Sequence, residues 1–186
     1  MQYKQLGRSG LQISEICLGT NMFGDGYVDD QRVFSVVDAA REHGVNFIDT
    51  ADAYHAGMSE QVVGRAVHED RHDFVIATKG FIATGPGPND VGLSRQHLIQ
   101  AVEDSLRRLG TDYIDLYQVH YWDPNTPVEE TIRTLDDMVR QGKIRYLGCS
   151  NFAGWQLMRA LWVSDNHGYE RFESVQPEYN FARREI

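Results

Sequence analysis

Four ionisable side chains stand at or just after apolar segments of this sequence. Asp49 and Tyr54 belong to "NFIDTADAY" (46–54), Lys79 ends "FVIATK", and His120 ends "IDLYQVH". A nearby ammonium stabilises a phenolate, and a carboxylate can pair with that ammonium and keep it charged. A histidine can orient a carbonyl by hydrogen bonding or help to relay a proton. These four groups together suit protonation of a carbonyl oxygen while a hydride reaches its carbon.

Each of these residues has an ordinary explanation when it is taken alone. Asp49 fits a loop or a helix cap, Tyr54 a packed surface ring, Lys79 a salt bridge and His120 a buried core histidine. Their equivalent positions at the ends of successive strands favour a shared site, because the carboxyl ends of parallel strands converge.

The elements that must position these side chains repeat as strand and helix. Helices are expected to begin at Asp29 or Asp30, at Ser59, at Ser94, and at a capping box of Thr126 and Glu129 with Pro127 between them, and a further helix is expected at 154–164. Strands are expected at 13–20, 46–50, 74–80, 114–120, 144–150 and 172–176. This order predicts a parallel sheet with right-handed crossovers.

Two α/β architectures fit such a repeat: a doubly wound open sheet and a (β/α)8 TIM barrel. The segment "GTNMFGDG" (19–26) lacks the GxGxxG pattern of the open dinucleotide-binding sheet. Residues 1–14 read as a hairpin that turns at "RSG" and could close the bottom of a barrel. We therefore expect a (β/α)8 TIM barrel with an N-terminal hairpin. About six of its eight βα units are present, and "ARREI" (182–186) begins the sixth helix.

The motifs of this chain resemble those of aldo-keto reductases over nearly its whole length. They are "GT" (19–20), "NFIDTADAY", "IATK", "DLYQVHYWD" (115–123), "IRYLGCSNF" (144–152) and "VQPEYN" (175–180). The resemblance implies a catalytic tetrad of Asp49, Tyr54, Lys79 and His120, with Tyr54 as general acid. It implies cofactor contacts from Thr20, Asp49, Ser150, Asn151 and Gln176. It places Met22, Phe23 and Trp122 at the substrate pocket, although local packing explains these three equally well.

The resemblance further implies reduction of an aldehyde or ketone by NADPH, with NADH as the alternative, and without a metal. The segments "TPVEETI" and "QGKIRYLGCSNF" resemble the branch that also contains potassium-channel β subunits. A cofactor-binding regulatory subunit or an inactive truncated relative is therefore the competing interpretation. An aldolase with Lys79 as a Schiff-base lysine is a second enzymatic alternative, which Asp49 disfavours because it would keep Lys79 protonated.

Residues 1–186 are expected to form a single barrel domain that lacks its last strands and C-terminal loops. In the family, that segment holds the adenosine phosphate and stacks on the nicotinamide. The chain alone is therefore expected to bind cofactor weakly and to turn over poorly. Its exposed sheet edges favour association with a C-terminal fragment or with a second copy.

The overall composition limits the classes of partner and the cellular location that we expect. The 186 residues carry a net charge of −9, which argues against nucleic acid and anionic membranes. No signal peptide or membrane-length apolar run is evident, and Cys17 and Cys149 read as reduced core thiols, so a cytoplasmic protein is expected. His68 and His72 have the spacing of a metal pair, but no third ligand accompanies them.

Overall fold

A curled sheet of six parallel strands forms the framework of the protein. The computed structural model describes residues 1–24, 26 and 28–184. The strands pair in chain order, so each strand lies beside the next one along the sequence. They are β3 (Cys17–Gly19), β4 (Phe47–Asp49), β5 (Val75–Gly80), β6 (Ile114–Val119), β7 (Ile144–Ser150) and β8 (Phe172–Gln176). The sheet ends at β3 on one side and at β8 on the other, as in part of a barrel.

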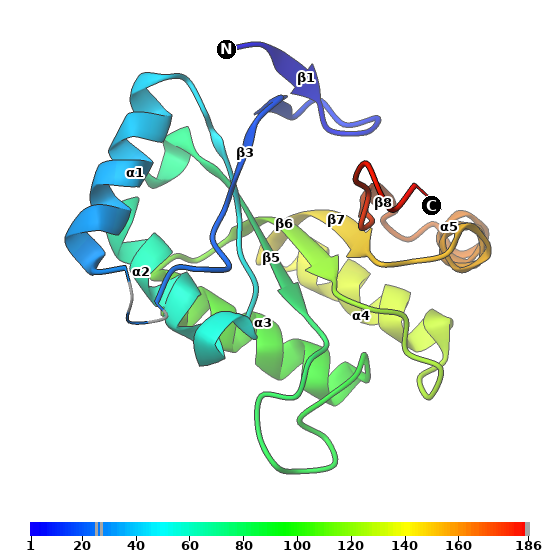
Figure 1. Ribbon diagram of the computed structural model, residues 1–186. Coiled ribbons are helices and arrows are strands. Elements are labelled where there is room, and N and C mark those ends of the chain that lie inside the picture. Colours follow the sequence, from blue (N-terminus) through cyan, green and yellow to red (C-terminus); the bar gives the residue numbers. More distant parts are fainter. Residues whose placement is uncertain (25, 27, 185–186) are drawn as a thin grey trace.

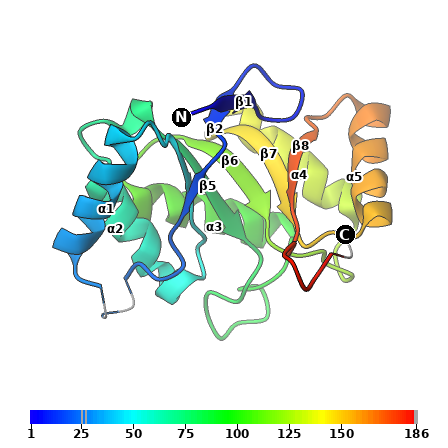
Figure 2. The ribbon, with the colours of Figure 1, turned by 45° about the horizontal axis from the view of Figure 1, so that its top comes forward.

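Helices cover the outer face of this sheet, as Figures 1 and 2 show. They are α1 (Asp30–Glu42), α2 (Met58–Ala66), α3 (Arg95–Leu109), α4 (Val128–Arg140) and α5 (Gly154–His167), with short 3-10 turns at Tyr54–Gly57 and Arg71–Asp73. Fully buried apolar side chains such as Val37, Leu98 and Leu135 form one core with strand residues such as Ile76 and Ile114. Burial of these helix faces against the sheet supplies the main stabilising free energy of the fold.

The predicted N-terminal hairpin is confirmed. β1 (Tyr3–Gln5) pairs antiparallel with β2 (Gln12–Ser14). The Ser14 N–H donates to the Asn46 side chain over 2.7 Å, and the Arg8 N–H donates to Glu173 over 2.8 Å. Asn46 precedes β4 and Glu173 lies near the start of β8, so the hairpin spans the amino ends of the sheet, opposite the strand ends that carry Asp49 and Lys79.

Several expected boundaries were wrong. The strand predicted over 13–20 is divided, because 13 and 14 pair within the hairpin and only Cys17–Gly19 joins the large sheet. Ser59 does not cap α2, which begins at Met58 after the left-handed Gly57 (φ 85°). That helix ends at Ala66, so His68 and His72 lie outside it.

Two further expectations fail near the ends of other helices. The Thr126 hydroxyl donates to Asp123 over 2.7 Å instead of capping α4, and Pro127 precedes that helix. Residues 182–184 are not helical, and the remainder of the predicted sixth helix, 185–186, lies outside the described residues.

Cys149 is buried as expected, whereas Cys17 is exposed and is therefore not a core thiol. In the described part of the chain, no helix has the length and apolar character needed to span a membrane.

Candidate active site

The four ionisable residues meet at the carboxyl ends of three neighbouring strands. Asp49 ends β4, Lys79 is the last residue but one of β5, and His120 directly follows β6. Tyr54 begins the 3-10 turn that connects β4 to α2. Because β4, β5 and β6 are adjacent and parallel, these ends lie side by side.

A buried ion pair between Lys79 and Asp49 forms the centre of this group. The Lys79 Nζ donates to Asp49 Oδ2 over 2.6 Å and to the Thr50 carbonyl over 3.0 Å. The two charged side chains are 2% and 10% exposed, respectively. A charge removed from water to this extent needs such a partner, because its desolvation is otherwise very unfavourable.

The Tyr54 hydroxyl shares the same ammonium. It accepts from Lys79 Nζ over 3.3 Å, and the ammonium lies 5.0 Å from the centre of the phenol ring. The turn that carries Tyr54 is strained, since His55 (φ 48°) and Ala56 (φ 54°) both adopt left-handed backbone conformations. A hydrogen bond of 2.8 Å between His55 Nε2 and the Asn21 carbonyl helps to hold this turn in place.

His120 faces Tyr54 edge to face, with ring centres 6.2 Å apart. The imidazole also stacks on Tyr121 at 5.0 Å. Burial, and secondarily the positive charge of Lys79, lower the pKa of His120 to about 4. The imidazole is therefore neutral at neutral pH, and its Nδ1 has no hydrogen-bond partner among the described residues. A neutral imidazole can act as a hydrogen-bond donor toward a carbonyl oxygen.

Gln118 is a site residue that we did not identify from the sequence. Its Nε2 donates to Asp49 Oδ1 over 3.2 Å and to Gln176 Oε1 over 3.3 Å. It lies two residues before His120, and residues two apart in a strand share one face. An amide residue two positions before His120 in a predicted strand was therefore the one signal that the sequence offered.

Ser150, Asn151 and Gln176 lie at the carboxyl ends of β7 and β8. The Ser150 hydroxyl donates to the Gln176 carbonyl over 2.9 Å, and the Asn151 amide donates to Ser150 Oγ over 3.0 Å and to the His120 carbonyl over 3.2 Å. Asn151 adopts a left-handed conformation (φ 55°), which asparagine tolerates better than most residues. These amide and hydroxyl groups have the chemistry to bind a carboxamide such as that of nicotinamide.

The structure does not give Thr20 the open surface expected of a cofactor contact. It is fully buried, and its hydroxyl donates to the Asp49 carbonyl over 3.0 Å and lies 2.9 Å from Ser59 Oγ. Ser59, the residue expected to cap α2, also bonds Thr50 Oγ1 over 3.0 Å. This hydroxyl network contacts the backbone carbonyl of Asp49 and the side chain of Thr50, and so helps to hold the end of β4 in place.

The three residues expected at the substrate pocket have different environments. Met22 is 57% exposed, whereas Phe23 is 8% exposed and packs in the main core. Trp122 is partly buried and contacts Phe152 and Trp155 edge to face, each at 5.5 Å between ring centres. Phe23 is thus a core residue with little surface for a ligand, while Met22 and Trp122 keep accessible surface.

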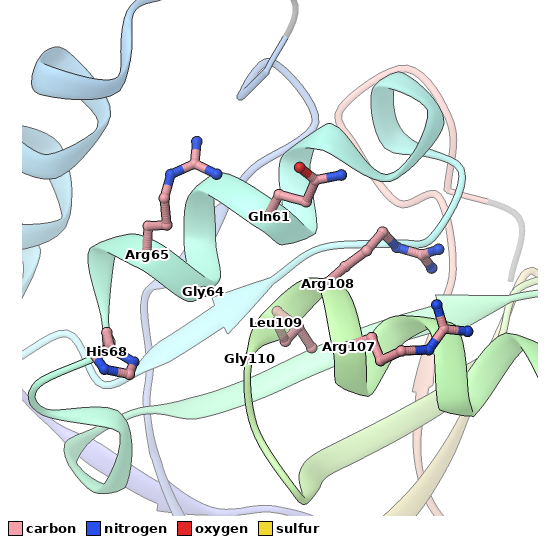
Figure 3. Close-up of a pocket in the computed structure, with 8 residues that line it drawn as sticks. All are labelled: Gln61, Gly64, Arg65, His68, Arg107, Arg108, Leu109 and Gly110. Atoms are coloured by element: carbon pink, nitrogen blue, oxygen red, sulfur yellow. The ribbon is translucent and has the colours of Figure 1, made fainter.

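A separate pocket lies on the outer side of the molecule, between α2 and α3 (Figure 3). Arg65 and His68 line it from the α2 side and Arg107 from α3. Arg65 pairs with Asp30, and Arg107 pairs with Asp104, so acidic neighbours already neutralise these cations. We assign no ligand to this pocket.

A sequence model of the Aldo/keto reductase family matches residues 15–186. The chain belongs to this family. A probable voltage-gated potassium channel subunit beta from Arabidopsis thaliana is 40% identical over 190 residues, which cover 100% of this chain and 58% of that protein. The aldo-keto reductase YhdN of Bacillus subtilis (strain 168) is 37% identical over 191 residues, which cover 100% of this chain and 56% of that protein.

The uncharacterized oxidoreductase YrpG, also from Bacillus subtilis (strain 168), is 37% identical over 195 residues, which cover 99% of this chain and 60% of that protein. The chain thus spans somewhat more than half the length of these curated relatives. Family membership agrees with the partial barrel that the six parallel strands form.

Proposed function

We propose that this site reduces an aldehyde or a ketone to the alcohol, with Tyr54 as general acid. The observation that carries the proposal is the shared position of the Lys79 ammonium. It lies 2.6 Å from the Asp49 carboxylate and 3.3 Å from the Tyr54 hydroxyl, inside a buried site. This ammonium stabilises the phenolate that remains after Tyr54 gives its proton to the carbonyl oxygen.

The other residues have supporting roles in this proposal. Asp49 keeps Lys79 charged, and Gln118 orients the second oxygen of that carboxylate. His120, neutral at neutral pH, donates a hydrogen bond to the substrate carbonyl and sets its direction. An ammonium paired in this way is a poor amine nucleophile, which disfavours the Schiff-base alternative.

NADPH is the proposed cofactor, with NADH as the alternative, and it would supply the hydride to the carbonyl carbon. Ser150, Asn151 and Gln176 would hold the carboxamide of its nicotinamide. Gln118 donates to both Asp49 and Gln176, and this link supports the assignment because a nicotinamide held there would lie near Tyr54. The family resemblance favours NADPH over NADH.

Transfer of deuterium tests the proposed reaction even at low turnover. The chain is incubated with NADPH deuterated at the transferable position and with an aromatic aldehyde, and the alcohol is examined by mass spectrometry. We expect one deuterium at the former carbonyl carbon, and none with Lys79→Met. If the wild-type chain binds NADPH but yields no labelled alcohol after prolonged incubation, the proposed reaction is wrong.

A cofactor-binding regulatory subunit is the second candidate. The similarity to proteins named as potassium channel β subunits favours it. It predicts tight NADPH binding, negligible aldehyde reduction and a stoichiometric protein partner. Pull-down followed by turnover measurement on the captured complex separates the two candidates.

A cytoplasmic location and association with further protein complete the proposal. The edges of the sheet at β3 and β8 favour a second copy or a segment equivalent to the rest of the relatives' length. A small carbonyl compound remains the proposed substrate, without nucleic acid or membrane as partner.

A further inference from the structure

The strand β5 separates two groups of polar side chains. Lys79 points to the inner face of the sheet, where it meets Asp49 and Tyr54. The Thr78 side chain points the other way, as would a Cβ added at Gly80, since side chains alternate along a strand. The outer group consists of Asp52, Glu60, Thr78, Arg108 and Tyr117, and we call it the outer cluster.

A buried ion pair anchors the outer cluster to the turn that carries Tyr54. Glu60 of α2 is fully buried and accepts from Thr78 Oγ1 over 2.5 Å and from Arg108 Nε over 2.6 Å. Arg108 reaches from α3 across to Gly57, where an added Cβ would lie 2.5 Å from Arg108 Cδ. Gly57 ends the 3-10 turn that Tyr54 begins, so this turn rests directly on the ion pair.

Asp52 and Tyr117 are the members of this cluster whose side-chain oxygens lack a well-aligned hydrogen-bond partner in the described part of the chain. Asp52 is 2% exposed and Tyr117 is fully buried. Among the described residues, neither Asp52 oxygen nor the Tyr117 hydroxyl makes a hydrogen bond of good geometry. Both face Gly80: a Cβ there would lie 2.1 Å from the Tyr117 hydroxyl and 3.3 Å from Asp52 Oδ2. A buried carboxylate without a well-aligned donor is costly, whereas a neutral carboxyl can itself donate.

Burial, more than the surrounding charges, favours the neutral form of Asp52. Glu60 of α2 and the Tyr117 phenol of β6 face it, together with Arg108 of α3 and Lys79 of β5. Burial, and then the negative charge of Glu60, raise the pKa of Asp52 to about 7, although Arg108, the Ala53 N–H and Lys79 act in the opposite direction. Ionisation of Asp52 would place a second buried negative charge beside Glu60.

Asp52 is linked through the backbone to Lys79 and to Tyr54, the proposed proton donor. Its backbone N–H donates to the Lys79 carbonyl over 3.1 Å, and Tyr54 follows two residues later. We propose that Asp52 is a positioning residue, which holds Tyr54 beside Lys79 while its carboxyl is neutral and lets that segment shift when it ionises. The consequence for catalysis rests on the function proposed above, but the consequence for the geometry of Tyr54 does not.

Nuclear magnetic resonance of the tyrosine rings tests this inference without requiring turnover. The chain is labelled with ζ-13C tyrosine, the Tyr54 signal is identified with Tyr54→Phe, and spectra are recorded from about pH 5 to about pH 9. In the wild type we expect a small step in the Tyr54 signal near pH 7, distinct from the large shift that ionisation of a phenol itself produces. Asp52→Asn, which mimics the neutral carboxyl, should abolish that step.

The matched control is Asp38→Asn, at a carboxylate of α1 whose side chain is 59% exposed, and it should leave the step in place. The inference is overturned if the Tyr54 signal has the same pH profile in the wild type and in Asp52→Asn. If Asp52→Asn does not fold, Tyr117→Phe decides the question. Removal of the hydroxyl dipole should move the step to higher pH, and an unchanged midpoint would overturn the inference.

Single-turnover aldehyde reduction tests the role of Asp52 in catalysis. Above about pH 7 the wild-type rate should fall about 10-fold or more relative to Asp52→Asn, because a small displacement of the acid is costly, while the two proteins should bind the aldehyde equally. Equal rates in that range would overturn the positioning role in catalysis. Absence of reduction in both proteins would instead refute the proposed function, and the tyrosine signals would still decide the positioning of Tyr54.

Discussion

At the scale of single residues, the buried Lys79–Asp49 pair links stability to chemistry. Both side chains are almost completely removed from water, and each neutralises the other over 2.6 Å. The same ammonium is shared with Tyr54, so a change that breaks the pair alters both the fold and the proposed proton donor.

Lys79→Met should lower the free energy of unfolding by about 3–5 kcal/mol, because it leaves the Asp49 carboxylate buried without its partner. Urea denaturation at neutral pH measures this loss. Lys4→Met is the matched control, since the Lys4–Glu15 pair is 71% and 34% exposed and its loss should cost at most about 1 kcal/mol. Similar losses in the two variants would show that burial of the Lys79 pair has no special effect.

His120 should make stability fall as the solution is acidified. Its pKa is about 4 in the folded protein, below the usual value of 6.5, so the unfolded chain takes up the proton first. Stability should therefore decline from about pH 6.5 to about pH 4, by at most about 3 kcal/mol, and level off below that. His120→Gln should remove this part of the decline in denaturation curves, whereas His72→Gln, at an 81% exposed imidazole, should not. A decline that persists in full in His120→Gln would contradict this reasoning.

At the scale of elements, the sequence predicted regular strands and helices better than the turns between them. "IRYLGCS" and "FESVQ" match β7 and β8, and each begins soon after a glycine with positive φ that follows a helix, Gly142 or Gly168. The start of α2 was missed since it depends on the strained 3-10 turn before it, which His55 holds through a contact with Asn21. Such long-range contacts leave no local signal.

The sequence placed the four ionisable residues at strand ends, and the structure brings them together as expected. It did not reveal Gln118, which reads as part of a buried strand, or the burial of Thr20 and Phe23. Whether a residue near a strand end faces the site or the core depends on the twist of the sheet and the path of each loop, which a local pattern does not specify.

Close approach of α2 and α3 should make Gly64 sensitive to substitution. A Cβ at Gly64 would lie 2.4 Å from the Leu109 carbonyl, so Gly64→Ala must push the two helices apart and should cost about 1–3 kcal/mol in urea denaturation. Gly154→Ala, at the first residue of α5 with nothing within 4 Å of its added Cβ, should be neutral or slightly stabilising. Equal effects would mean that helix contact at Gly64 does not limit stability.

At the scale of the whole molecule, apolar surface remains exposed along one face of α5. Trp155, Met158 and Trp162 are 61%, 63% and 62% exposed, and their spacing places them on one side of the helix. The adjacent β8 forms an edge of the sheet. Exposed apolar surface next to a strand edge promotes association.

Sedimentation velocity over a range of protein concentrations should show reversible association of the chain. Trp155→Lys and Trp162→Lys should shift the protein toward the monomer, because each places a charge in the apolar face. Val36→Lys, at a 37% exposed residue of α1, is the control and should sediment like the wild type. A single monomeric species at every concentration would contradict the expected association.

The central claim is that Tyr54 gives the proton in carbonyl reduction. Single-turnover mixing of excess enzyme with NADPH and an aldehyde, compared between the wild type and Tyr54→Phe, tests it most directly. The account predicts a rate loss of about 10²–10⁴-fold in Tyr54→Phe with unchanged affinity for NADPH, because only the acidic hydroxyl is removed. An undiminished rate in Tyr54→Phe would contradict it.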